Sequence, residues 1–210
     1  MTYQVFILLV PLVTTPYISR VLGSEGVGIN AYTNSIIQYF VLFGSIGINT
    51  YGNRQIAYCR DDKKELSRTF WEISILRFIT IFISYAIFLI YLNMTTQYHS
   101  YFIAQSFQII AAAFDISWFF MGLENFKITV VRNFLVKIVS LVCIFTMVKS
   151  INDIGIYILI LSLSLLFGNL SLWGYLKKYV RKPIFKQLSL VKHIRPSVSL
   201  FIPQIAIQIY

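Results

Sequence analysis

Long apolar runs alternate with short polar segments along the whole chain. Six of these runs, each 18 to 24 residues long, contain few charged side chains. They cover residues 2–19, 29–51, 70–92, 98–121, 128–148 and 154–176. A helix of about 20 apolar residues crosses a hydrocarbon core about 30 Å thick. The pattern therefore predicts an all-α polytopic membrane protein, in which six transmembrane helices form one lobe.

The same pattern divides the chain into three parts. Residues 1–176 form the six-helix lobe, residues 177–196 form a basic linker, and residues 197–210 begin a seventh apolar run. Composition agrees with a lipid environment, because 57% of the residues are hydrophobic, 12% are charged and the mean hydropathy is +0.71. Soluble domains carry about 25% charged residues. The sequence has no CxxC pair or Cys/His cluster, so neither a metal nor another cofactor is expected.

The lysines and arginines between the runs indicate the orientation. Thirteen of the 18 lie in every second connection, whereas the other connections hold only Arg20 and Lys149. Cytoplasmic loops of membrane proteins are enriched in these residues. The N-terminus and residues 177–196 are therefore expected in the cytoplasm. Topology and anionic membrane lipids account for the net charge of +10, so nucleic acid is not expected as a partner.

Five charged side chains fall inside the predicted spans, where each costs about 2.5–3.5 kcal/mol at a helix centre. At 1.5 Å per residue, Arg77 and Asp115 lie about 10 and 9 Å from the cytoplasmic surface. An Arg77–Asp115 pair is therefore expected, with Glu72 near the interface as the alternative partner of Arg77. A role in ligand binding is equally open for these residues. Asp115 is also a candidate for proton uptake.

The fifth run contains the other two charges, Arg132 and Lys137, about 6 and 13 Å from the cytoplasmic surface. No carboxylate in the six runs reaches the depth of Lys137, which favours a water-filled cavity or an anionic ligand there. Arg132 either binds the same ligand or extends to the lipid headgroups. Arg20 and Arg54 end the first two runs at opposite surfaces. With Arg77, these cations are the candidate binding residues for an anionic headgroup that crosses the membrane.

The sequence gives no indication of catalysis. HExxH and GxSxG motifs are absent, and His99 and His193 are isolated along the chain. The glycine-rich stretch 23–28 lacks the lysine and the strand–helix context of a phosphate loop, so it is interpreted as a turn. A membrane enzyme would need nucleophile, base or metal-binding groups clustered at one membrane face. A role other than catalysis is therefore predicted.

Five strings, spread along the chain, carry a resemblance to a known family. They are PLVTTPYISRVLG at 11–23, SEGVG at 24–28, TYGNRQI at 50–56, DISWFFMGLENF at 115–126 and FIPQIAIQIY at 201–210. In this order they resemble the bacterial flippases that carry lipid-linked oligosaccharides. The resemblance implies the multidrug and oligosaccharide exporter fold, with two six-helix lobes facing each other across a cavity. It also implies undecaprenyl-diphosphate-linked oligosaccharide as the substrate, in surface polysaccharide assembly.

Relative to this family, the chain corresponds to the first lobe and the start of the second. A missing C-terminal lobe is therefore expected to complete the transporter, since alternating access needs two opposed units, and the chain is expected to be a truncated product or a fragment. Two alternatives are half of a multidrug or cation exporter and a truncated membrane protein without transport. The spans hold three cations and two carboxylates, which favours anionic over cationic cargo.

Overall fold

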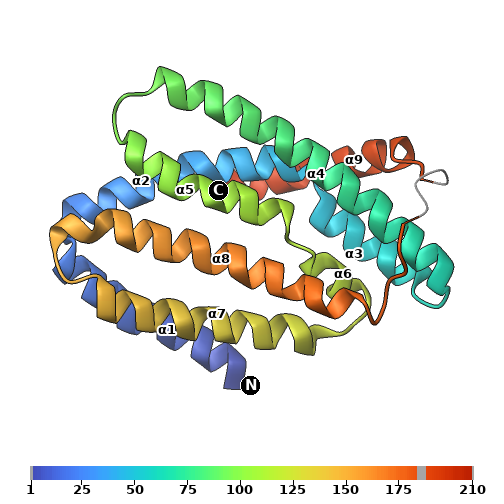
Figure 1. Cartoon of the computed structure of the whole chain (residues 1–210), viewed down its shortest axis with the longest axis horizontal. Helices are drawn as coiled ribbons and strands as arrows, with labels where there is room; N and C mark the ends of the chain where they lie inside the picture. The colour runs from blue at the N-terminus through green and yellow to red at the C-terminus, as the bar shows by residue number, and fades with distance from the viewer. Residues whose placement is uncertain (1, 184–187, 210) are drawn as a thin grey trace.

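The protein is a bundle of helices that lie roughly side by side (Figure 1). The computed structural model describes residues 2–183 and 188–209, and within these ranges every regular element is helical. The elements are α1 (Thr2–Val21), α2 (Gly23–Ser45), α3 (Ile48–Cys59), α4 (Lys63–Met94), α5 (His99–Ala113), α6 (Ser117–Gly122), α7 (Phe126–Met147), the 3-10 helix η1 (Ile151–Asp153), α8 (Ile154–Leu176) and α9 (Val191–Ile209). The all-α prediction is confirmed. Residues 1, 184–187 and 210, which belong to the predicted lobe, linker and seventh run, lie outside the described residues.

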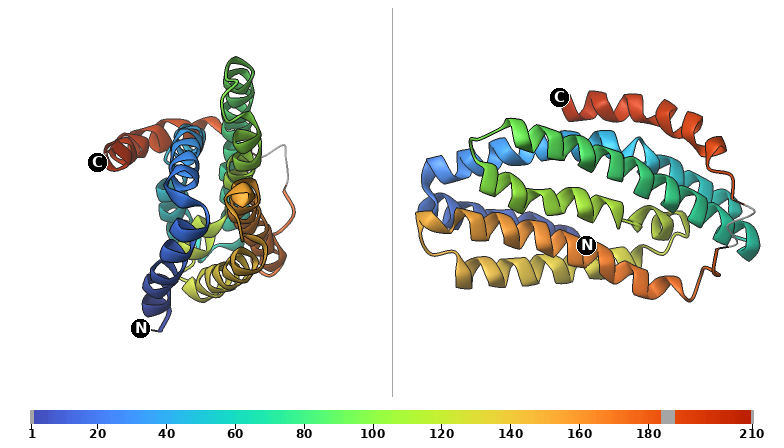
Figure 2. Two further views of the ribbon diagram at one scale, coloured as in Figure 1. Left: turned by 90° about the vertical axis from the view of Figure 1, so that its left-hand side faces the viewer. Right: turned by 45° about the horizontal axis from the view of Figure 1, so that its top comes forward.

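Helix α5 lies at the centre of this arrangement. It packs against α8 on one side and against α2 and α4 on the other, while α7 packs on α8 (Figure 1). Helix α1 contacts both α2 and α7. Helix α9 rests on α3 and α4, and viewed from the end of the bundle it projects away from the other helices (Figure 2).

Four segments of the described chain are long and apolar enough to cross a membrane, by length and composition. They are Lys63–Met94, His99–Gly122, Phe126–Met147 and Ile151–Leu176. These segments correspond to the last four of the six predicted runs, and each run lies within its segment or exceeds it by one residue at most. Helices α1 and α2 have 20 and 23 residues but do not belong to this set. A total of six transmembrane helices therefore stays a prediction.

The second predicted run, 29–51, is not one continuous helix. Helices α2 and α3 replace it, separated by Ile46 and Gly47, whose φ angles are +39° and +69°. Glycine adopts such left-handed angles without steric cost. A Cβ atom at position 47 would also meet the α9 backbone at Ser197 and Phe201. Gly47 therefore turns the chain and lets α9 approach it closely.

The fourth predicted run, 98–121, is also broken, between α5 and α6. The Asp115 carboxylate accepts a hydrogen bond from the Ser117 backbone N–H (2.9 Å) and so satisfies one donor at the start of α6. At the other end of α6, a Cβ atom on Gly122 would lie 2.7 Å from the Cβ atom of Ile56 in α3. Helix α6 is thus held against α3, and the end of α5 is left inside the bundle.

Aromatic packing fixes the position of α6. The ring of Trp118 stacks on Phe70 of α4, with ring centroids 5.7 Å apart. Gly52 of α3 makes room for this indole, because a Cβ atom there would lie 2.5 Å from Trp118 Cε3. Aromatic pairs contribute about 0.5–1.5 kcal/mol beyond their buried area. This packing therefore stabilises the chain break at Asp115.

Two boundaries differ from those drawn on the sequence. The glycine-rich stretch 23–28 is not a turn, because α2 begins at Gly23 and the turn is confined to Leu22. A φ angle of +67° at Gly23 starts the helix directly after that turn. Helix α9 begins at Val191, six residues before the apolar run that starts at 197.

Candidate functional site

A polar cavity of about 170 Å³ lies inside the apolar bundle. It is lined by Gln38, Val41, Ser45, Asn49, Arg77, Gln108, Ala112, Asp115, Arg132, Leu165 and Asn169. Five or six water molecules, at ~30 Å³ each, would fill this volume. The cavity is smaller than the ~300–1,000 Å³ of pockets that enclose drug-sized ligands. It is therefore suited to a small polar group, such as a phosphate, and not to an oligosaccharide.

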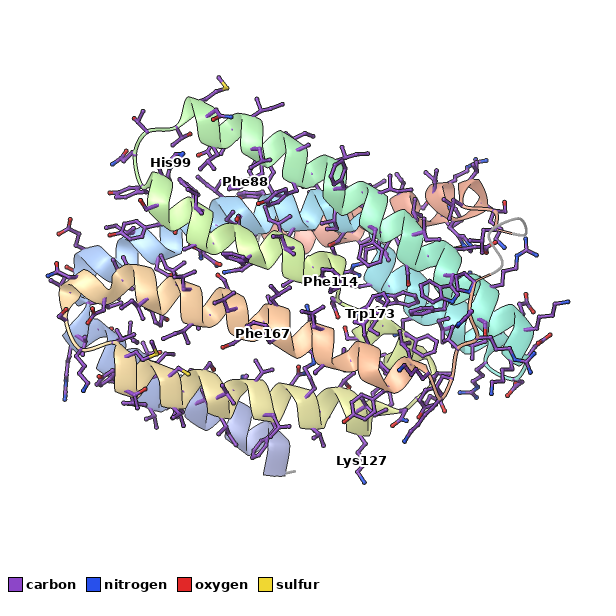
Figure 3. All side chains as sticks on the ribbon, viewed as in Figure 1. Phe88, His99, Phe114, Lys127, Phe167 and Trp173 are labelled. Atoms are coloured by element: carbon purple, nitrogen blue, oxygen red, sulfur yellow. The ribbon has the colours of Figure 1, made fainter. Side chains whose placement is uncertain are left out.

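The broken end of α5 forms one wall of the cavity. The last carbonyls of a helix have no N–H donor within that helix. At the end of α5, three side chains from other helices donate to them. These pairs are Arg77 Nε with the Ala112 carbonyl (2.6 Å), Asn169 Nδ2 with the Ala111 carbonyl (2.7 Å) and Trp173 Nε1 with the Phe114 carbonyl (2.8 Å). Figure 3 shows Phe114 and Trp173 close together at this end of α5 and α8. Irregular backbone at membrane depth is stable when it is satisfied in this way.

Arg77 is the most deeply buried charge at the cavity, with 2% of its surface exposed. Its Nη1 donates to Asn49 Oδ1 (2.5 Å), and its Nη2 lies 3.6 Å from Asp115 Oδ2. The expected Arg77–Asp115 pair is therefore present, and Glu72 has other partners. At 3.6 Å this contact is electrostatic and too long for a hydrogen bond. Arg77 thus joins α4 to α3 and to the end of α5.

Arg132 reaches the cavity from α7. Its Nη1 donates to Asn169 Oδ1 (2.9 Å), on the same amide group that caps α5. The lining therefore contains two guanidinium groups and one carboxylate, Asp115, whose side chain is 20% exposed. The excess of positive charge suits an anionic ligand, since guanidinium groups match carboxylate and phosphate geometry.

Amide side chains extend the polar region along the contact between α2 and α5. The bonds are Gln38 Nε2 to Gln108 Oε1 (2.8 Å), Gln105 Nε2 to Asn34 Oδ1 (3.1 Å) and Thr33 Oγ1 to Gln105 Oε1 (2.7 Å). These amide side chains are not among the residues predicted from the sequence, where only charged residues within the runs were candidates. The sequence does indicate a polar contact here, because amide side chains inside apolar runs need hydrogen-bond partners from neighbouring helices.

The other candidate binding residues lie elsewhere. Arg20, in the last turn of α1, and Arg54, in α3, are exposed. Lys137 is half-buried in α7 and does not line the cavity, and no carboxylate in the described part of the chain forms an ion pair with it. Of the seven residues singled out by sequence, three come together at the cavity.

Glu72 occupies a second site, where the start of α9 and the segment before it meet α4. Its fully buried carboxylate accepts contacts from Arg68 Nε (3.0 Å), Lys192 Nζ (2.7 Å), His193 Nε2 (2.9 Å) and the Ser189 backbone N–H (2.7 Å). A buried charge is tolerated when it is paired and hydrogen-bonded in this way. Glu72 is therefore a structural link between α4 and α9.

His193 is not isolated in space, in contrast to its place in the sequence. Its Nδ1 lies 2.7 Å from the Tyr51 hydroxyl, and its Nε2 binds Glu72. Burial lowers the pKa of His193, although the hydrogen bond to Glu72 opposes this effect. A neutral ring that donates through Nε2 and accepts the Tyr51 proton at Nδ1 satisfies all three groups. These partners are 142 and 121 residues away along the chain, so no local pattern indicates them.

One family of known proteins and two curated relatives are similar to this chain. A family model described as polysaccharide biosynthesis protein matches residues 1–210. A protein of Escherichia coli (strain K12) named "Putative O-antigen transporter" is 28% identical over 155 residues, which are 70% of this chain and 36% of that protein. A protein of Shigella dysenteriae with the same name is 27% identical over 148 residues, 70% of this chain and 37% of that protein. The chain spans little more than a third of the length of these curated relatives. No solved structure matches it.

Proposed function

Because the chain belongs to the polysaccharide biosynthesis protein family, we propose that it forms one lobe of a flippase for undecaprenyl-diphosphate-linked oligosaccharides. It is a multi-pass membrane protein with several apolar helices, and its relatives bear the name of O-antigen transporters. The proposed location is the bacterial cytoplasmic membrane, with the N-terminus in the cytoplasm as the basic connections indicate. In this proposal a second, opposed lobe completes the transport path, because alternating access needs two units.

The observation that carries this proposal is the positively charged cavity inside an apolar bundle. Arg77 and Arg132 line it together with a single carboxylate, Asp115. Guanidinium groups bind phosphate through short, charge-assisted hydrogen bonds. The cavity accommodates one phosphate group of the lipid carrier, whereas the sugars occupy the larger space between two lobes. Lys137 is proposed as a further cation on the path of the diphosphate.

Export of an organic cation is the main alternative, and the charge of the cavity argues against it. Cationic cargo needs carboxylates without competing cations. Here Asp115 already lies 3.6 Å from Arg77 and shares the cavity with Arg132. Transport of an organic cation by the complete protein, without transport of lipid-linked oligosaccharide, would reverse this choice.

The test is transport of a fluorescent lipid-linked oligosaccharide by the complete protein in proteoliposomes. We expect Arg132→Gln to lower the initial rate about tenfold or more, because a hydrogen bond to a charged group contributes about 1.5–3 kcal/mol. Lys127→Gln is the matched control, since Lys127 lies on the same helix and its exposed side chain points away from the bundle (Figure 3). Equal rates for the two variants, at equal amounts of inserted protein, would contradict the proposal.

A further inference from the structure

An apolar groove runs between α7 and α8, and several side chains that line it are exposed. Its volume is about 600 Å³, which is within the ~300–1,000 Å³ of ligand sites. Aliphatic side chains form most of its walls, and several of them are more than half exposed, including Leu135 and Val139. Along α7 the groove extends from Arg132 to Met147, a length of about 22 Å at 1.5 Å per residue.

Arg132 lines this groove and the polar cavity as well. Close helix packing brings it to this position, because a Cβ atom on Gly168 of α8 would lie 3.4 Å from Arg132 Cδ and 2.5 Å from Val136 Cγ2. The aliphatic stem of Arg132 therefore lies against the α8 backbone. Its guanidinium group is bound to Asn169, which also lines the cavity. Arg132 thus lies where the apolar groove meets the polar cavity.

We propose that this groove holds the isoprenoid tail of the lipid carrier while Arg132 binds the adjoining phosphate. The identity of the lipid rests on the proposed function. Half of a hydrocarbon core about 30 Å thick is about 15 Å, so the acyl chain of a phospholipid in one leaflet fills only part of a 22 Å groove. A long polyisoprenoid chain fills all of it. A single guanidinium group at one end of an apolar groove selects a lipid with an anionic phosphate head.

This arrangement separates the two halves of an amphiphilic substrate. The tail stays on the outer side of the bundle, between α7 and α8, and the phosphate is held at the boundary with the polar interior. Neither the 170 Å³ cavity nor the groove has to enclose the whole lipid. A small polar cavity is therefore compatible with a very large substrate.

Native mass spectrometry of the complete protein in detergent tests the inference by binding. The probes are undecaprenyl phosphate, undecaprenol and dioleoyl phosphatidylglycerol. We expect undecaprenyl phosphate to bind at least about tenfold more tightly than either of the others, because undecaprenol lacks the charge and the phospholipid lacks the long tail. In Arg132→Gln the preference for undecaprenyl phosphate over undecaprenol should disappear, while undecaprenol still binds.

Two variants that fill the groove test the place of the tail. Ser164 of α8 is half-buried and lines the groove, and Ser164→Phe should weaken binding of undecaprenyl phosphate about tenfold. Val139→Phe fills the groove from the α7 side at an exposed position and should have the same effect. This variant keeps the test valid if Ser164→Phe fails to fold. Leu170→Phe is the matched control, because Leu170 lies on α8 outside the lining.

Equal binding by Val139→Phe and Leu170→Phe would overturn the inference, and so would equal affinity for undecaprenyl phosphate and phosphatidylglycerol. The binding and transport assays separate the two proposals. Strong, groove-dependent binding without transport would contradict the flippase function alone. If the wild-type protein transports the oligosaccharide, but the groove variants bind undecaprenyl phosphate as tightly as the wild type does, only the assignment of the groove is contradicted.

Discussion

The Glu72 carboxylate and the His193 ring are in contact at 2.9 Å although 121 residues separate them along the chain. Glu72 belongs to α4 and His193 to α9, so their contact holds the start of α9 on the bundle. Lys192 and the Ser189 backbone N–H bind the same carboxylate. One buried charge therefore organises the junction between α4 and α9.

Removing this charge should loosen the junction. Glu72→Gln keeps the side-chain volume and leaves Lys192, about half exposed, without its carboxylate. We expect a loss of about 2 kcal/mol, as for a hydrogen bond to a charged group, because water can still reach the cation. Thermal unfolding of the protein in detergent measures this loss. Glu65→Gln, at an exposed position in the same helix, is the control, and equal melting temperatures for the two variants would contradict the structural role.

Acid should destabilise the same junction through His193. Burial lowers the pKa of its ring, the hydrogen bond to Glu72 opposes this, and the nearby charges of Lys192 and Arg68 lower it further. The folded-state pKa lies below the ordinary value of about 6.5. The stability contribution is therefore complete above pH 6.5 and is lost as the pH falls through the folded-state pKa.

The difference between wild type and His193→Gln measures this contribution, because both proteins keep Glu72. We expect the melting temperature of the wild type to fall more steeply between pH 7 and pH 5. Parallel pH profiles for the two proteins would show that His193 does not titrate in this range.

Apolar runs in the sequence indicate where helices lie but not where they break. The run 98–121 is continuous in hydropathy, yet α5 ends at Ala113 because Arg77, Asn169 and Trp173 supply donors to its last carbonyls. These donors come from α4 and α8, and their positions depend on the packing of the whole bundle. A break that is stabilised by distant residues leaves little trace in the local pattern.

The candidate site was predictable only in part, because the sequence indicates the depth of a side chain but not its direction. Depth along a helix is set by residue number, so the pairing of Arg77 with Asp115 followed from the sequence. The direction in which a side chain points around the bundle is not set by depth. Lys137 was expected at a water-filled cavity or an anionic ligand because no carboxylate reaches its depth, whereas the polar cavity is lined by Arg132, five residues earlier on α7.

The turn at Gly47 gives a prediction about backbone geometry. Gly47→Ala should destabilise the protein by about 2–4 kcal/mol, because alanine is strained at a φ of +69° and its methyl group would push α9 away. Gly28→Ala is the control within α2, where a Cβ atom meets nothing within 4 Å. That change should stabilise the protein by about 1 kcal/mol through helix propensity. Thermal unfolding distinguishes the two, and changes of the same sign would contradict the role of Gly47.

Lys137 and Arg132 lie on different faces of α7. Five residues at 3.6 per turn place them about 140° apart around the helix axis. Lys137 instead shares a face with Ile144, one heptad later, and Ile144 is buried in the same apolar cluster as Ile18 of α1. The two cations of α7 are therefore directed to different sides of the helix, and their roles are separable by substitution.

We expect Lys137→Ala to lower transport at least about tenfold, the effect of losing about 1.4 kcal/mol of binding, while insertion and stability stay normal. No ion pair with a described carboxylate is broken by this change, and a charge that costs about 2.5–3.5 kcal/mol at membrane depth is removed. Lys137→Arg should keep part of the activity, because it retains the charge but not the compact ammonium group. Lys149→Ala, at an exposed position beyond the end of α7, is the control for transport per inserted protein. If Lys137→Ala and Lys149→Ala transport equally well, Lys137 has no part in binding the diphosphate.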